Sequence, residues 1–265
     1  MKKILKYILI VFVFLNLLIV LSGKSWMYKA ISITYLKGYT SSYIHDFVHF
    51  PAKTIEAGEH QKWLVSKNYN KANLPSFIKP VNDSLETVAL MVIKNDSIVF
   101  EEYWHGYSSD TMSNSFSMAK SWISTLVGVA IQDGKIESVE QKVSDFIPAF
   151  SEGENAKITI KHLLTMSSGL NWNEDYYNPI GQTAEAYYGD DLRGLVLDLK
   201  SINPPGKVFR YHSSCSQLLA FIVEKATSKT ISEYASEKLW KPMGAKHSAL
   251  WNTDKKNGDE KAFCC

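Results

Sequence analysis

The longest hydrophobic run of the chain lies at its N-terminus. Residues 7–23 carry no charge, and Lys2, Lys3 and Lys6 precede them. These seventeen residues are at the short end of a membrane span. The same pattern is typical of the charged and apolar regions of a signal peptide. The bulky side chains of residues 18–21 offer no small-residue cleavage site. We therefore favour an uncleaved signal anchor, an N-terminal transmembrane helix, over a cleaved peptide.

The lysines before the run also predict its orientation. Positive charge stays on the cytoplasmic side of a span, so the rest of the chain is expected on the extracytoplasmic side (periplasmic or outer) of a bacterial membrane. Residues 24–86 alternate short apolar patches with polar stretches and are interpreted as a tether and an extension. The main domain is expected over residues 87–265, after the anchor at 1–23.

The pattern within the main domain changes from strands to helices. Two β-rich runs, 87–94 and 97–103, flank Asn95-Asp96 and predict a hairpin. The first run is almost continuously apolar, which predicts burial on both faces. Residues 121–131 are apolar nearly all round and predict a buried helix that ends near Asp133-Gly134.

Further helices are expected at 158–166 and 217–225, the first opened by Thr159. Thr230 and Glu233 form a capping-box pattern before another helix. Strands first and then mostly helices predict an α+β domain.

Composition excludes several classes of function. A chain of 265 residues can bury one sizeable core. Its formal net charge of +2 lacks the basic excess of a nucleic-acid-binding protein. The sequence contains no GxxxxGK[ST], HExxH or CxxC motif, so we expect no cofactor and no metal. The three cysteines, Cys215, Cys264 and Cys265, indicate no disulfide framework.

The candidate chemistry begins with Ser117-Met118-Ala119-Lys120, at the head of the predicted buried helix. Residues three apart face the same side of a helix, so Ser117 and Lys120 are expected to meet. Burial disfavours a charged amine, and a neutral amine beside a serine hydroxyl supplies a nucleophile with its own base. The tetrad alone also fits an N-cap serine followed by a surface lysine.

The motifs that follow carry a family resemblance. Their order is the tetrad, then residues 162–170, then Pro205-Gly206 before Tyr211-His212-Ser213, and finally residues 239–245. Together they resemble the penicillin-binding-protein and class C β-lactamase-like serine hydrolases over residues 87–265. Residues 173–176, together with 240–242 and 249–251, are most similar to the branch of nylon-oligomer hydrolases and carboxylesterases.

This resemblance implies a β-lactamase/transpeptidase-like fold, an antiparallel sheet flanked by helices beside a mainly helical region. It implies that Ser117 is acylated by a small ester, amide, β-lactam or D-amino-acid peptide, with Lys120 and Tyr211 as acid and base. A phenol near positive charge is more readily ionised and can shuttle a proton. Tyr176 is expected to line the substrate pocket, whereas the neighbouring aromatic residues are expected to pack in the core or in loops.

Two departures from the family pattern leave a second reading open. Ser213 stands where many relatives have asparagine, and its hydroxyl can bond Lys120 or a substrate carbonyl but offers fewer hydrogen bonds. The third family motif, Lys-Thr-Gly or His-x-Gly, does not occur in the sequence. We therefore expect a chain truncated at its C-terminus, and the alternative function is a non-catalytic binding relative or an inactive remnant.

Overall fold

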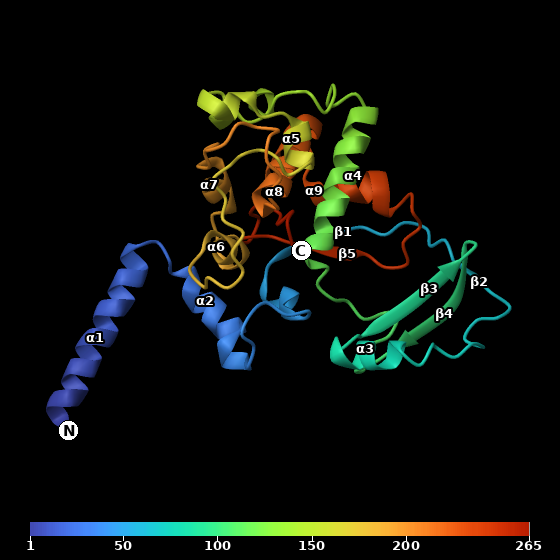
Figure 1. Ribbon diagram of the computed structural model, residues 1–265, viewed down its shortest axis with the longest axis horizontal. Coiled ribbons are helices and arrows are strands. Elements are labelled where there is room, and N and C mark those ends of the chain that lie inside the picture. Colours follow the sequence, from blue (N-terminus) through green and yellow to red (C-terminus); the bar gives the residue numbers. More distant parts are fainter. Residues whose placement is uncertain (265) are drawn as a thin grey trace.

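The computed structural model describes residues 1–264 and consists of a helical body, two small sheets and an N-terminal helix that extends away from the body (Figure 1). The helices are α1 (Lys2–Leu21), α2 (Trp26–Ile33), α3 (Ile78–Ser84), α4 (Ala119–Gln132), α5 (Ile160–Leu164), α6 (Gln182–Tyr188), α7 (Leu192–Leu197), α8 (Ser213–Thr227) and α9 (Ile231–Ala235). The strands are β1 (Ala52–Ile55), β2 (Leu64–Val65), β3 (Ala89–Lys94), β4 (Ser97–Tyr103) and β5 (Ala249–Asn252).

The core of the body forms where α4 and α5 pack against α8. Ile123 and Leu126 of α4 and Leu218 and Ile222 of α8 are fully buried. The prediction of a helix buried nearly all round is wrong for α4, because Ser121, Ser124, Thr125 and Gly128 are exposed along one face. These small residues separate the apolar positions at helical spacing, so only one stripe of the helix is covered.

The predicted helix boundaries are largely confirmed. Gly134 follows the end of α4 with φ of 66°, which suits a residue without a side chain. Thr159 accepts a hydrogen bond from the His162 amide at the start of α5, and Thr230 forms the predicted capping box with Glu233 at the start of α9. The helix expected from residue 217 begins earlier, at Ser213.

The predicted hairpin is β3 and β4, which pair antiparallel. Asn95 and Asp96 both have positive φ, the pattern of a type I′ turn that matches strand twist. Burial of the first strand on both faces is not observed, because Met91, Val92 and Ile93 are exposed. Within residues 1–264 this strand is the edge of its sheet, in the order β2-β4-β3.

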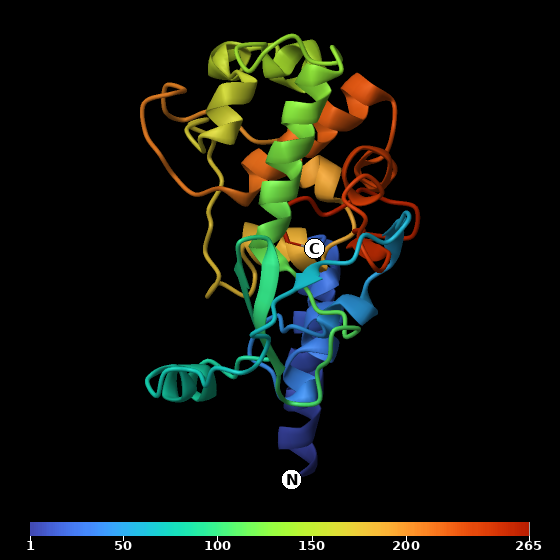
Figure 2. The same ribbon diagram turned by 90° about the vertical axis from the view of Figure 1, so that its right-hand side faces the viewer.

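The two sheets make the fold α+β, but the wholly antiparallel sheet of the expectation is only partly observed. Strand β2 runs parallel to β4, whereas β1 and β5 form a separate antiparallel pair. Turning the structure by 90° shows the hairpin below most of the helical body, near the lower end of α4 (Figure 2).

The extension between residues 24 and 86 contributes to the core of the body. Helix α2 packs against α6, and β1 pairs with β5 from the opposite end of the chain. Trp26, Ile33 and Phe50 are buried in the main hydrophobic cluster. The segment therefore does more than connect α1 to the body.

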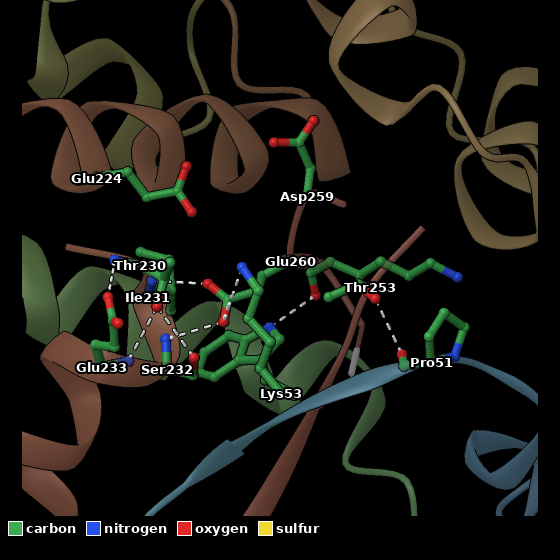
Figure 3. Close-up of polar contacts among 12 residues, drawn as sticks. Pro51, Lys53, Glu224, Thr230, Ile231, Ser232, Glu233, Thr253, Asp259 and Glu260 are labelled. Atoms are coloured by element: carbon green, nitrogen blue, oxygen red, sulfur yellow. Dashed lines mark hydrogen bonds and ion pairs between the residues drawn. The ribbon is translucent and has the colours of Figure 1, made fainter. Parts of the chain in front are cut away.

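The segment 259–264 runs through the interior. The Glu260 carboxylate accepts hydrogen bonds from the Ile231 amide at 2.7 Å and the Ser232 amide at 3.1 Å, at the start of α9 (Figure 3). Gln217 of α8 bonds the same segment twice, donating to the Glu260 carbonyl and accepting from the Ala262 amide, both at 2.8 Å.

Lys261 is fully buried, and its ammonium group lies 3.7 Å from the centre of the Phe50 ring. Burial lowers the pKa of Lys261 well below its usual value, and the charge of Lys29 lowers it further. Of the cysteines, Cys215 is free and buried, and Cys264 is disulfide-bonded, contrary to expectation. The expectation for Cys265 lies outside the described residues.

Replacing Glu260 by glutamine is expected to destabilise the protein. The carboxylate accepts two backbone hydrogen bonds in the interior, and the amide group of glutamine would face one of those donors. Losing a buried hydrogen bond to a charged group costs about 1.5–3 kcal/mol. Urea unfolding of the wild-type protein and of Glu260→Gln measures this difference. The control is Glu237→Gln, an exposed partner of Lys229, with an expected change within about 0.5 kcal/mol. Equal midpoints for Glu260→Gln and the control would contradict the prediction.

Candidate active site

Ser117 and Lys120 meet at the start of α4. Ser117 lies in a 3₁₀ turn, Phe116–Met118, directly before the helix, and its side chain is exposed. Lys120 belongs to the first turn of α4 and is 9% exposed. Its Nζ donates to Ser117 Oγ at 2.9 Å and to the Phe263 carbonyl at 2.6 Å. The expected one-turn spacing therefore brings an exposed hydroxyl against a buried amine.

Tyr211 approaches the same amine from the segment before α8. Lys120 Nζ lies 5.1 Å from the centre of the Tyr211 ring, within the range of a cation–π contact. The Tyr211 side chain is 39% exposed, so part of the ring is open to solvent. The packing of α4 against α8 thus brings together Ser117, Lys120 and Tyr211.

The carboxylate of Glu174 joins Trp172, Tyr176 and Ser213, which form a wall beside Tyr211. It accepts four hydrogen bonds at 2.6 Å, from Trp172 Nε1, the Tyr176 hydroxyl, the Ser213 amide and Ser213 Oγ. A carboxylate at the start of a helix such as α8 is favourably placed, because the first amides of the helix have no partners within it. The sequence pattern pointed to Tyr176 and Ser213 but did not identify Glu174 as the group that joins them.

Ser213 is not placed as expected. Its side chain is 2% exposed, and its hydroxyl donates to Glu174 instead of Lys120. The hydroxyl hydrogen is therefore engaged in the bond to Glu174 and does not point to Lys120. The Tyr176 side chain is mostly exposed. Two effects raise the pKa of its phenol: the larger is desolvation of the part that is covered, and the second is the hydrogen bond to Glu174.

The remaining aromatic residues mostly follow the expectation of core packing. Trp172, Tyr187 and Tyr188 are buried, whereas Tyr177 is exposed. A cavity of about 430 Å³ lies beside the site, lined by residues 109–115 and by Trp122 and Trp240. Ser117, Lys120 and Tyr211 do not line it, so it is separate from the group of reactive side chains.

The side chains of this site fit nucleophilic chemistry more than metal chemistry. Across residues 1–264 no three histidine, cysteine, aspartate or glutamate side chains are grouped to hold a metal ion. A serine hydroxyl bonded to an amine has its base in contact. A phenol next to that amine supplies a second group for proton transfer.

Residues 74–259 match the family model described as Beta-lactamase. The chain belongs to the β-lactamase family. The protein is 27% identical over 179 residues to the 6-aminohexanoate-dimer hydrolase of Paenarthrobacter ureafaciens, covering 63% of this chain and 45% of the relative. It is 25% identical over 212 residues to a Bacillus subtilis protein assigned as the penicillin-binding protein PbpX, covering 77% of this chain and 50% of the relative.

The fold is similar to that of a solved Bacillus anthracis protein assigned as a 6-aminohexanoate-dimer hydrolase. The TM-score is 0.71 at 20% identity, covering 91% of this chain and 66% of the other. The chain spans about half the length of the curated relatives it matches.

The stability of this family member is expected to fall in mild acid because of His212, the residue between Tyr211 and Ser213. His212 is buried, and desolvation lowers its pKa, with Arg210 lowering it and Glu174 opposing the shift. Because the folded protein disfavours the protonated ring, the stability is complete above the unfolded pKa of about 6.5 and is lost as the pH falls below that value towards the lower folded pKa. One proton contributes at most about 1.4 kcal/mol per pH unit.

Urea unfolding between pH 7.5 and 5 measures this dependence. In His212→Asn the slope is expected to be shallower, because the titrating ring is absent. Identical slopes in the wild-type protein and the variant would rule out His212 as the source.

Proposed function

We propose that the protein is a serine hydrolase that cleaves an ester or amide through an acyl-enzyme on Ser117. The observation that carries this proposal is the 2.9 Å hydrogen bond between Lys120 Nζ and Ser117 Oγ at the start of α4. Membership of the β-lactamase family supports the reaction class. The activity and substrate of the whole protein are part of the proposal, because the matched relatives are about twice as long.

Acylation requires one proton to move from the nucleophile to the leaving group. Lys120 accepts the proton of Ser117 as Ser117 Oγ bonds the carbonyl carbon of the substrate. Tyr211 donates a proton to the departing alcohol or amine as its bond to that carbon breaks, and recovers one from Lys120. The Tyr211 ring lies 5.1 Å from Lys120 Nζ, so its phenol lies near the amine. The exchange requires the hydroxyl to come within hydrogen-bonding distance of the amine in the substrate complex.

Deacylation reverses the roles of these groups. A water molecule gives one proton to Tyr211 or Lys120 and adds to the acyl carbon. The bond to Ser117 Oγ then breaks, and the serine oxygen takes back a proton. The products are a carboxylic acid and the free serine, so no other reactant is required.

Tyr176 offers an exposed aromatic ring to a substrate bound near the site. The Tyr176 side chain is exposed and its hydroxyl donates to Glu174, which leaves the ring available for contact with a substrate. One relative is named for hydrolysis of the 6-aminohexanoate dimer. Linear amides, esters, D-amino-acid peptides and β-lactams are the proposed substrate classes.

The second candidate function is binding without turnover. The 265 residues contain no Lys-Thr-Gly or His-x-Gly sequence. In the serine hydrolases that the sequence resembles, this third motif is expected to supply an oxyanion donor. Removing one oxyanion donor typically costs about 2.7–4 kcal/mol of transition-state stabilisation. This candidate predicts ligand retention by a folded protein that forms no acyl-enzyme.

Incubation with a fluorophosphonate is expected to label Ser117. Peptide mapping locates the adduct, and hydrolysis of a chromogenic short-chain ester measures turnover. Ser117→Ala is expected to abolish labelling. Lys120→Met and Tyr211→Phe are expected to slow it by about 10²–10⁴-fold, the usual contribution of a general acid or base.

The matched control is Ser124→Ala, which removes an exposed hydroxyl from the same helix. This variant is expected to retain the wild-type rate. Labelling at another residue, or full turnover in Ser117→Ala, would exclude Ser117 as the nucleophile. A folded wild-type protein that neither labels nor hydrolyses the ester would favour binding without turnover.

We also infer that α1 anchors the protein in a bacterial membrane with the body on the extracytoplasmic side. Helix α1 has a mean hydropathy of 2.8 and none of its residues is buried against the body. A signal sequence satisfies the same criterion, so the proposal depends on the missing small-residue cleavage site.

After expression in a bacterium, the protein is expected to stay in the membrane fraction through alkaline carbonate extraction. Protease added to spheroplasts is expected to digest the body, whereas a cytoplasmic marker enzyme remains intact. A soluble product that begins near Lys24 would instead establish cleavage. A protease-resistant body in intact spheroplasts would reverse the orientation.

A further inference from the structure

Asn114 connects the segment before Ser117 to the N-terminal extension. The residue is buried, and its polar groups are paired on both sides. Its backbone N–H donates to the Ile44 carbonyl at 2.8 Å. Its side-chain Nδ2 donates to Asp46 Oδ1 at 3.2 Å and to the Tyr187 hydroxyl at 2.9 Å. Its Oδ1 accepts from the Phe116 amide at 2.9 Å. A side chain with all these bonds has one permitted orientation, because any rotation would leave a buried polar group unpaired.

Asp46, in the N-terminal extension, is the acceptor to which the Asn114 side chain binds. Its side chain is 0% exposed, which is costly for a carboxylate unless donors surround it. Three donors do so, namely Asn114 Nδ2, the Tyr187 hydroxyl at 2.8 Å and the Tyr43 amide at 3.2 Å. All three groups donate hydrogen bonds, and an ionised carboxylate only accepts them, so no donor is left unpaired around Asp46.

Phe116 explains why the segment needs support. Its φ is 46°, in the left-handed region, which is unusual for a bulky aromatic residue. Such a conformation persists only where the surroundings determine it. The Phe116 amide is the group that Asn114 holds, and the next residue is Ser117. The direction of Ser117 toward Lys120 therefore depends on the bonds made one and three residues earlier.

We propose that Asp46 is a positioning residue for the nucleophile, holding Ser117 against Lys120 through Asn114 and the Phe116 amide. Its catalytic consequence rests on the proposed hydrolase function, whereas its structural consequence does not. The extension thereby determines the geometry of a site whose reactive side chains all come from the main domain.

Two single variants and one double variant test this connection in the full chain, in detergent, at pH 7.5. Asn114 Nδ2 and the Tyr187 hydroxyl share Asp46 Oδ1, and the Tyr43 amide has Asp46 Oδ2. Asp46→Asn replaces one of these oxygens by a donor, so either the Tyr43 amide or the pair on Oδ1 loses its acceptor. Asn114→Ala removes the bond to Phe116. The double variant Asp46→Asn/Asn114→Asp restores the pairs with reversed polarity. The new amide at position 46 can donate to the new carboxylate at position 114, and that carboxylate can still accept from the Phe116 amide. Asp83→Asn, at an exposed position that pairs with Lys79 four residues earlier, is the matched control.

The first readout is hydrogen–deuterium exchange of residues 114–118, followed by mass spectrometry. It does not require an active enzyme. Exchange is expected to rise about tenfold in both single variants, as for the loss of a buried hydrogen bond. The double variant and the control are expected to match the wild-type protein. Unchanged exchange in Asn114→Ala would overturn the proposal whatever the activity, because this variant removes both the bond to Asp46 and the bond to the Phe116 amide.

The second readout separates positioning from general stability. With a chromogenic ester, kcat is expected to fall about tenfold in Asp46→Asn, as for a misplaced nucleophile, while KM changes less than about twofold. The exchanged double variant is expected to recover most of kcat. A lowered Tm with unchanged kcat well below the transition would show a structural role only and would overturn the proposal. Raised exchange in the single variants of a protein that does not label at Ser117 would uphold the positioning and refute the hydrolase function.

Discussion

The site depends on one buried amine. Lys120 lies on the first turn of α4 with its Nζ between two oxygen acceptors, Ser117 Oγ and the Phe263 carbonyl. A buried amine without acceptors is costly, so these contacts hold the first turn of the helix and the segment 259–264 at a common place. The Tyr211 ring also lies near this amine, with its centre 5.1 Å from Lys120 Nζ. The packing of α4 on α8 is what brings these three parts of the chain together.

Carboxylates that accept several hydrogen bonds keep the surrounding segments in place. Glu174 binds the start of α8 to the loop that carries Tyr176, Glu260 binds the start of α9 to the segment after β5, and Asp46 binds the extension to the segment before Ser117. In each case several donors converge on one acceptor, and removing the charge would leave a donor unpaired in the interior. The architecture around these side chains therefore includes long-range polar contacts beside the apolar packing.

Ser213 has a structural part at the start of α8. Many relatives are expected to have asparagine here, and serine was expected to face Lys120. Instead its hydroxyl and its amide both bond Glu174. The serine thus serves the start of α8, and Tyr211 is left as the group from this segment that faces the amine.

Local patterns in the sequence determined the elements whose interactions are local. The turn at Asn95-Asp96, the caps at Thr159 and Thr230, the glycine after α4 and the pairing of Ser117 with Lys120 depend on neighbours within a few residues, so their spacing alone predicts them. Exposure of β3 and of one face of α4, and the contacts of Ser213 and Asp46, depend on which distant segments lie against them. Periodicity shows that a face is apolar, but only the tertiary structure decides what covers it and which donors reach a carboxylate.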